Sequence, residues 1–369
     1  MIYFFSIAIT VLIGTSIPHP ICRVKKKKCL YFADLKRYLL IFLAVLGPLL
    51  VSALRYGIGT DYFFTYIPQF NVIANGGSSY YEYGFYLLNR FIALFTKNGQ
   101  WLIATVSSIF MITVYAQLFE SAYNYTVSLI LFYLSYNYFI SLNNIRQSLA
   151  AAVILVAIHA LINENEKMFI FWMIIAVSIH RVSMAFFVVL IVVIINFKAW
   201  AYMVCSITVI LIGRKVFAGG ISFIARFIPR LQLYFYAEEL QMYNESTIGK
   251  LYILVNLVFM AILVFIELQM KCSKKELTRE WNFIKLNQCL LLCICGLDSI
   301  LPAAYRIARV FSFSQFIFLP NAVFKYGQGK KNKLILISII IIGMGVLFVQ
   351  NYISGAEEVF PYKSIIFNT

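Results

Sequence analysis

The sequence has little charge for its size. Only 12% of its 369 residues are charged, and 62% are apolar. A soluble domain carries roughly 25% charged residues, and here long apolar runs recur along the whole chain. This composition excludes an ordinary soluble domain and indicates a polytopic membrane protein, because a bilayer core of about 30 Å needs about 20 mostly apolar residues per helix.

Acidic residues are especially scarce. The three aspartates are Asp34, Asp61 and Asp298, and no Asp-x-Asp pair is present. A metal-bound nucleotide-sugar site is therefore not expected. The sequence also has no Walker phosphate loop and no Gly-x-Ser-x-Gly elbow, which argues against ATP-driven transport and serine hydrolysis.

The seven cysteines do not show the pattern of a disulfide framework. Those within apolar runs are Cys205, Cys289, Cys293 and Cys295. The last three have no histidine nearby, so we interpret them as small buried residues. We predict no metal and no cofactor.

We predict an all-α polytopic membrane protein with about twelve transmembrane helices, forming a single domain over residues 1–369. A shorter apolar segment, residues 84–95, is interrupted by Asn89 and Arg90 and is predicted to be re-entrant or interfacial. The predicted spans are 2–17, 38–54, 101–119, 126–141, 145–162, 168–180, 183–195, 200–213, 251–270, 283–301, 307–324 and 334–352.

Basic loops set the predicted orientation, because loops rich in Lys and Arg stay in the cytoplasm. Such loops lie at residues 23–37, 271–279 and 325–333. They share one side if residues 84–95 do not span, and a fused segment through His180 would give the same result. No basic residue precedes the first apolar run, which favours a first helix with its N-terminus outside over a cleaved signal peptide. The net charge of +16 is then a topology signal and not a sign of nucleic-acid binding.

Four polar clusters at helix ends then fall on the outer face. They are ALRYGIGTDY (53–62), NNIRQ (143–147), SIHRVS (178–183) and AYRIAR (304–309). We expect the outer loops 55–83 and 214–250 to contribute to the same site. Polar groups near membrane depth are costly and normally face a cavity, so we predict one shared outward-facing cavity.

Arginines dominate these clusters. Arg306 and Arg309 are three residues apart and should share a helix face. A guanidinium is a planar, permanently charged fork that suits phosphate oxygens, so these two arginines together with Arg55 and Arg146 would neutralise a diphosphate. Taken singly, each arginine also fits a lipid headgroup contact. The segment 221–235 has the pattern of an amphipathic helix in the membrane plane.

The candidate acid–base groups are His180, Asp61 and Glu82. A histidine can take a proton near neutral pH, although one at a helix end is often structural. Asp61 and Glu82 can activate a hydroxyl or orient a sugar, and they equally fit turn or cap positions, because Gly57 and Gly59 indicate a turn beside Asp61. The residues alone leave these roles open.

The order of these motifs resembles the EpsG family of bacterial exopolysaccharide polymerases, which is similar to the Wzy polymerases. The resemblance covers roughly residues 38–364 and ends in VFPYKS (359–364). In SIHRVS the serine lies one residue further from the histidine than in the family pattern. The residues that match the family motifs include Arg55, Asp61, Glu82, Asn143, Arg146, Gln147 and His180.

The resemblance implies a metal-independent glycosyltransferase that moves a growing glycan from polyprenyl diphosphate onto the terminal hydroxyl of a lipid-linked oligosaccharide repeat. It implies a GT-C-like cavity that opens outside the bacterial cytoplasmic membrane. Arg146, Arg306 and Arg309 would hold the diphosphate with support from other matched residues, His180 or Asp61 would take the proton, and Glu82 would orient the sugar. The supporting residues would be Arg55, Asn143 and Gln147.

Lipid-linked oligosaccharide and membrane lipids are the implied partners. A protein that regulates chain length is a further candidate partner. Two other functions remain open from the sequence. An O-antigen-ligase-like transferase would use the same donor with another acceptor, and a lipid-linked oligosaccharide flippase would move the substrate without chemistry. A transporter is expected to show internal repeats and polar groups near the midplane, which we do not find.

The predicted orientation can be tested with a cysteine at Ser78, in a chain whose native cysteines are replaced by serine. Ser78→Cys should react with a membrane-impermeant thiol reagent in intact cells, whereas Ser273→Cys in a basic loop should react only after lysis. Labelling in the opposite order would invert the topology.

Overall fold

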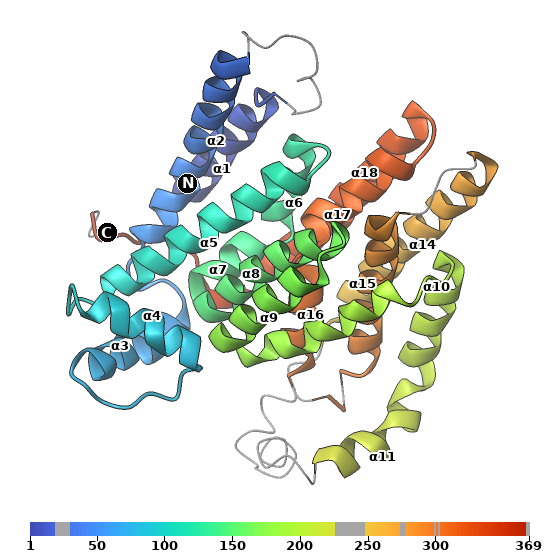
Figure 1. The fold of residues 1–369 in the computed structure, drawn as a ribbon. Helices are drawn as coiled ribbons and strands as arrows, with labels where there is room; N and C mark the ends of the chain where they lie inside the picture. Colours follow the sequence, from blue (N-terminus) through green and yellow to red (C-terminus); the bar gives the residue numbers. More distant parts are fainter. Residues whose placement is uncertain (19–29, 226–247, 274–277, 299, 302, 367–369) are drawn as a thin grey trace. The chain divides into compact units, whose positions relative to one another are not determined.

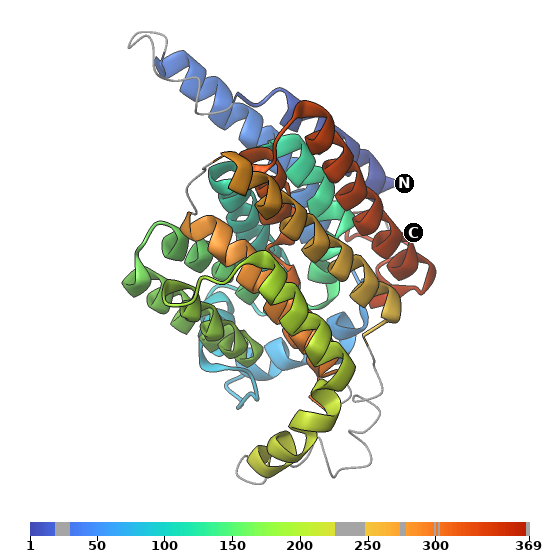
Figure 2. The same cartoon turned by 90° about the vertical axis from the view of Figure 1, so that its right-hand side faces the viewer.

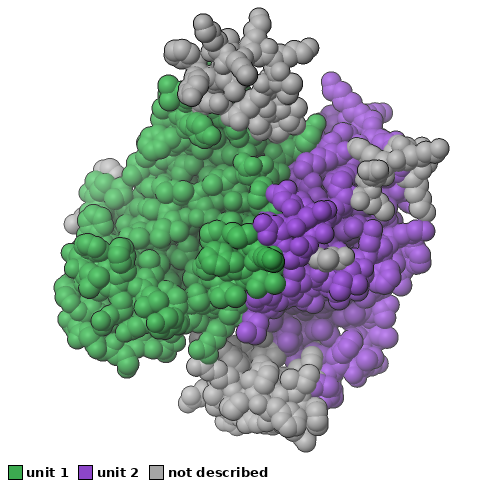
Figure 3. Space-filling model, in the orientation of Figure 1, with its two compact units in different colours: residues 1–159, 167–181, 348–369 green, residues 160–166, 182–347 purple. Residues whose placement is uncertain are grey.

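The computed structural model describes residues 1–18, 30–225, 248–273, 278–298, 300–301 and 303–366. Within these ranges the regular structure is helical (Figure 1), and the one β-bridge they contain joins Arg55 to Ser364. The predicted all-α fold is confirmed. The chain forms two compact units (Figure 3), which are described separately below.

Unit 1 comprises Met1–His159, Lys167–Arg181 and Phe348–Thr369. Its helices are α1 (Ile2–Thr15), α2 (Leu30–Ala53), a π-helix (Tyr62–Tyr66), α3 (Ile67–Ala74), α4 (Tyr83–Ala93), α5 (Gln100–Ser121), α6 (Tyr125–Leu134), α7 (Asn137–Asn143), most of α8 (Ile145–Ile162), α9 (Glu166–Ile179) and a short 3₁₀ turn (Ala356–Glu358).

An aromatic cluster holds the C-terminal segment of unit 1 in place. The ring of Tyr3 on α1 lies 5.0 Å from the ring of Tyr362, 5.3 Å from that of Phe360 and 5.5 Å from that of Phe139 on α7. The Tyr3 hydroxyl donates to the carbonyl of Val359 at 3.0 Å. Large buried rings of this kind dominate core packing, so the motif VFPYKS is anchored against both α1 and α7.

Unit 2 comprises Ala160–Glu166 and Val182–Leu347. Figures 1 and 2 both show α11 continuing from the end of α10. The helices are a 3₁₀ helix (Arg181–Val193), α10 (Ala199–Thr208), a π-helix (Val209–Gly213), α11 (Arg214–Ala225), α14 (Lys250–Ser273), α15 (Arg279–Gly296), α16 (Ala304–Ser312), α17 (Gln315–Asn321), a π-helix (Ala322–Tyr326) and α18 (Lys330–Ile353).

Six described helices are long and apolar enough to cross a membrane, and the number rises to eight if two bent helix pairs each form one span. The pairs bend by 49° between α6 and α7 and by 47° between α16 and α17. The six are Leu35–Ala53, Gln100–Ser121, Ile145–Ile162, Ala199–Phe217, Lys250–Met270 and Lys330–Ile353.

The predicted count of twelve spans is not confirmed. Helices α1 and α9 have 14 residues each, which gives about 21 Å at 1.5 Å per residue, short of a bilayer core of about 30 Å. The segment after His180 is a separate 3₁₀ helix, and α15 carries Arg279, Glu280 and Lys285. Helix α4 has only 11 residues, in agreement with the prediction that residues 84–95 do not span.

Arg55 is a buried organising residue of unit 1, with none of its surface exposed. Its Nε donates to the carbonyl of Leu142 at 3.0 Å, and its Nη1 donates to the hydroxyl of Ser107 at 2.6 Å and to the carbonyl of Ser52. Burial lowers the pKa of Arg55 to about 10, so it remains charged at neutral pH. Through these contacts Arg55 connects the end of α2 to α5 and α7.

Replacing Arg55 with methionine should destabilise unit 1 strongly. The change removes the donors for buried acceptors, each worth about 1–3 kcal/mol, so we expect the free energy of unfolding to fall by more than about 2 kcal/mol. Arg90→Met, at an exposed position on α4, should change it by less than about 0.5 kcal/mol. Denaturant unfolding in detergent measures both, and equal effects would contradict the structural role of Arg55.

Candidate functional site

The predicted turn at Gly57 and Gly59 is present and lies against Asn143. Both glycines have positive φ, +61° and +81°. A Cβ at Gly59 would lie 2.6 Å from Asn143 Oδ1. The Asp61 backbone N–H donates to the same oxygen at 2.9 Å. Only glycine allows this conformation and this close approach, so RYGIGTDY is held directly against NNIRQ.

Glu82 gathers positively charged and polar groups from two other segments. Its Oε2 lies 2.8 Å from Arg146 Nη1, and its Oε1 lies 3.8 Å from His180 Nδ1. The backbone N–H of Arg181 donates to Oε1 at 3.4 Å. Glu82 occupies the N-cap position of α4 without a side-chain cap hydrogen bond. The capping interpretation of this carboxylate is therefore not supported, and its contacts lie across the site.

Arg146 and His180 lie at opposite kinds of helix end, so the helix dipoles act on them in opposite senses. Arg146 lies in the first turn of α8, where the dipole is positive and another cation is unfavourable unless a counter-charge is near. Glu82 supplies that counter-charge. His180 directly follows the last residue of α9, at the negative end of that helix dipole. The site therefore brings a guanidinium and an imidazole to one carboxylate.

Two tyrosines surround this ion pair. The Arg146 guanidinium lies over the Tyr81 ring, 4.6 Å from its centroid. The Tyr66 hydroxyl donates to Asp61 Oδ2 at 3.4 Å. Burial raises the pKa of both phenols well above the usual value, and Asp61 adds to the effect at Tyr66. Both tyrosines therefore stay protonated at neutral pH and act as neutral donors.

A close approach between α4 and α9 sets the position of Glu82. A Cβ at Gly84 would lie 2.3 Å from Ser178 Oγ and 2.9 Å from the Ser178 carbonyl oxygen. Glycine is therefore needed where α4 begins. Ser178 and His180 belong to the same short segment, so this contact also fixes the carboxylate–imidazole distance.

The sequence analysis missed Glu357. Its carboxylate accepts hydrogen bonds from the side-chain amides of Asn143, at 2.7 Å, and Asn144. Glu357 has a φ of +68°, uncommon for a residue with a side chain. Two adjacent asparagines indicate a need for a polar partner, but no local signal identifies a residue more than 200 positions away as that partner.

Three of the four predicted polar clusters thus meet within unit 1. The contacts of Asp61, Glu82, Asn143, Arg146 and His180 join them. Gln147 is buried beside Arg146 in α8, and Arg55 is engaged by protein acceptors.

The fourth cluster lies in unit 2, on α16. Arg306 and Arg309 both lie over the ring of Tyr305, at 5.6 and 5.4 Å from its centroid. The prediction that these arginines share a helix face is confirmed. Convergence of this cluster with the other three remains a prediction, as does the outward-facing cavity.

The second predicted outer loop, residues 214–250, lies only partly in the described ranges. Of the segment 221–235, only the first residues belong to α11, and residues 226–235 lie outside the described part of the chain. The amphipathic helix predicted there therefore remains a prediction.

An apolar groove opens where α4 meets the start of α5. Its volume is about 420 Å³, and its lining residues are Phe91, Ile92, Phe95, Thr96, Trp101 and Thr105. Phe91 lies nine residues after Glu82, which is about 14 Å along a helix. An apolar groove and a charged group therefore belong to the same helix.

The helices and the polar site together define an integral membrane protein with a charged site built at helix ends. The chain matches the EpsG family over residues 38–364 and belongs to that family. A search of curated proteins found no similar protein. A search of solved structures found no similar fold.

The close approach at Gly84 predicts opposite effects for two glycine-to-alanine changes. Gly84→Ala should lower the free energy of unfolding by about 1–3 kcal/mol, because the added methyl group overpacks against Ser178. Gly345→Ala in α18, with nothing within 4 Å of the added atom, should raise it by about 0.4–1 kcal/mol. Denaturant unfolding in detergent checks both, and stabilisation by Gly84→Ala would contradict the close approach.

Proposed function

We propose that this protein polymerises an exopolysaccharide. It transfers a growing glycan from polyprenyl diphosphate onto the terminal hydroxyl of a lipid-linked oligosaccharide repeat at the outer leaflet. Membership of the EpsG family supports this reaction. The observation that carries the proposal is the contact of Glu82 with Arg146, Arg181 and His180, which assembles anion-binding and proton-accepting groups in one place.

In this proposal Arg146 binds the diphosphate. A guanidinium has five N–H donors, more than the contact with Glu82 uses, and it binds phosphate in a bidentate manner. The N-terminus of α8 adds backbone N–H groups and a positive dipole, which together favour a phosphate. As the sugar–phosphate bond breaks, this preorganised charge stabilises the departing diphosphate without requiring a metal ion.

His180 is the better candidate for the general base. The Glu82 carboxylate and the end of α9 both stabilise the positive charge that His180 gains when it takes the acceptor proton. Asp61 is the alternative, but it already accepts from Tyr66. Glu82 then orients the imidazole, in addition to the sugar contact that the sequence suggested.

The apolar groove between α4 and α5 suits a segment of the polyprenyl chain. Its lining is mostly aromatic and aliphatic. Lipid bound there would place its diphosphate toward the beginning of α4, where Glu82 and Arg146 lie. The groove thus gives the proposal a lipid site on the same helix as the charged group.

The remaining predicted residues have supporting roles in this proposal. Arg306 and Arg309 bind phosphate from α16, where Tyr305 fixes their side chains. Arg55 acts indirectly, by holding the helix ends that carry Asp61 and Asn143. In this proposal the site faces outside the bacterial cytoplasmic membrane. The contribution of the loop 214–250 stays a prediction, because its residues 226–247 lie outside the described part of the chain.

Replacing Arg146 with alanine should reduce long glycan by at least about 100-fold, because a charge aimed at the transition state is lost. Single lipid-linked repeats should accumulate. Size fractionation of cell glycan and analysis of lipid-linked intermediates measure both, normalised to the amount of protein in the membrane. Arg146→Lys, which keeps the charge and loses the fork, should also be impaired.

Arg90→Ala is the matched control, because Arg90 is an exposed arginine of unit 1, and it should leave the polymer unchanged. Normal polymer with Arg146→Ala would contradict the diphosphate role. Repeats trapped on the inner leaflet after gene deletion would favour a flippase. Single repeats joined to another acceptor, with no long chain in the unmodified cell, would favour a ligase.

A further inference from the structure

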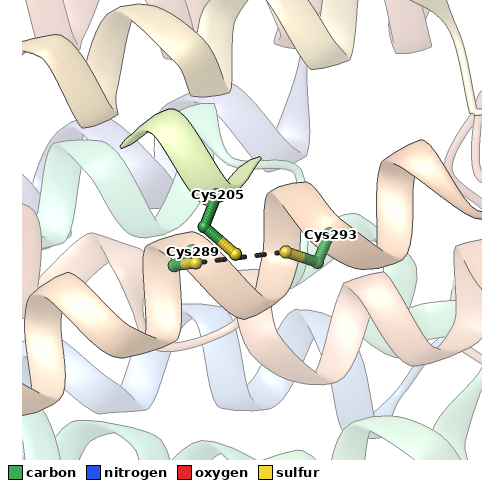
Figure 4. A group of neighbouring side chains, drawn as sticks. All are labelled: Cys205, Cys289 and Cys293. Atoms are coloured by element: carbon green, nitrogen blue, oxygen red, sulfur yellow. Dashed lines mark hydrogen bonds between the residues drawn. The ribbon is translucent and has the colours of Figure 1, made fainter. Parts of the chain in front are cut away.

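Three thiols meet in unit 2. Cys205 lies on α10, and Cys289 and Cys293 lie one turn apart on α15 (Figure 4). Their three sulfur atoms all lie within 4.8 Å of one another. The sequence suggested a group made of Cys289, Cys293 and Cys295. In the structure Cys295 lies outside the cluster, and its third member is Cys205, which is 84 positions before Cys289 in the chain.

The backbones of α10 and α15 are held close on both sides of this thiol cluster. On one side, the Glu267 carboxylate accepts from the backbone N–H of Ala199, and Lys285 Nζ lies 2.7 Å from both Glu267 Oε1 and the Phe197 carbonyl oxygen. On the other, a Cβ at Gly296 would lie 2.8 Å from the Cα of Ile210. The sulfur atoms are therefore brought together by fixed helices and not by a mobile loop.

The spacing suits a soft cation. Cys289 Sγ and Cys293 Sγ are 4.0 Å apart. Three thiolates around a metal with bonds of about 2.3 Å place their sulfurs about 4.0 Å apart in a planar trigonal centre. No two of the three sulfur atoms are more than 4.8 Å apart, so binding a metal ion shortens each sulfur–sulfur distance by less than about 1 Å. Rotation of the side chains supplies this movement.

Packing alone does not require this arrangement. A cysteine that serves as a small apolar residue needs only to fill space. Cys295 is such a residue: it is buried on the same helix and is outside the cluster. Cys205 is exposed on α10 and lies beside the two sulfurs of α15.

We propose that Cys205, Cys289 and Cys293 form a binding site for one thiophilic d¹⁰ cation, of the Cu(I) or Zn(II) class. Thiolate sulfur selects these ions over hard cations such as Mg²⁺ and Ca²⁺. The ion displaces the thiol protons, which pass to water, and no change of oxidation state is involved. The site uses none of the residues assigned to glycan transfer, and binding joins α10 to α15 more firmly.

The test uses purified full-length protein in detergent under reducing conditions, with Cys22, Cys29 and Cys272 replaced by serine. Cd(II) is the first probe, because its thiolate complexes absorb in the ultraviolet. We expect one Cd(II) per chain. Each of Cys205→Ser, Cys289→Ser and Cys293→Ser should weaken binding by at least about 100-fold, since each removes a direct ligand.

Cys295→Ser is the matched control and should bind Cd(II) like the parent protein. Thermal unfolding without metal checks that all variants are folded. Competition with Cu(I) and with Zn(II) then shows which of the two ions the site prefers. The proposal is overturned if the parent protein binds no Cd(II), if a folded cluster variant keeps full affinity, or if Cys295→Ser loses as much affinity as the cluster variants.

Discussion

The site in unit 1 depends on the carboxylate of Glu82. Arg146 lies in the first turn of α8, where its charge opposes the helix dipole, and a guanidinium near membrane depth is costly without a partner. The Glu82 contact at 2.8 Å removes both penalties. Because the same carboxylate also contacts His180 and Arg181, three segments that are distant in the sequence are fixed by one side chain.

Sequence patterns predicted the features of this site that are determined within one short segment, such as turns and helix faces. The glycines of RYGIGTDY predicted a turn, and the spacing of Arg306 and Arg309 predicted a shared helix face; both are present. The polar helix ends predicted that side chains would gather, and three of the four clusters do. The pairing of Glu82 with Arg146, the burial of Arg55 and the partner role of Glu357 rest on contacts between distant segments, which no local pattern encodes.

The number of spans was harder to predict, because hydropathy does not show where a helix breaks. Tyr136 has a φ of +65° at the bend between α6 and α7, and its hydroxyl donates to the carbonyl of Ala356. This side-chain hydrogen bond ties the bend to the C-terminal segment, about 220 positions away in the chain. An apolar run of the right length can therefore contain two helices.

Preorganisation connects the fold to the proposed chemistry. An arginine that is free in solution must lose side-chain freedom when it binds a diphosphate. In this protein Glu82 and Tyr81 hold Arg146 in the folded state, so that cost is met during folding and not during the reaction. A charge that is already in place where negative charge develops is the arrangement that lowers a transition-state energy most effectively. In the proposed reaction the ion pair would serve both stability and catalysis, because the carboxylate that offsets the charge of Arg146 also holds its guanidinium in position.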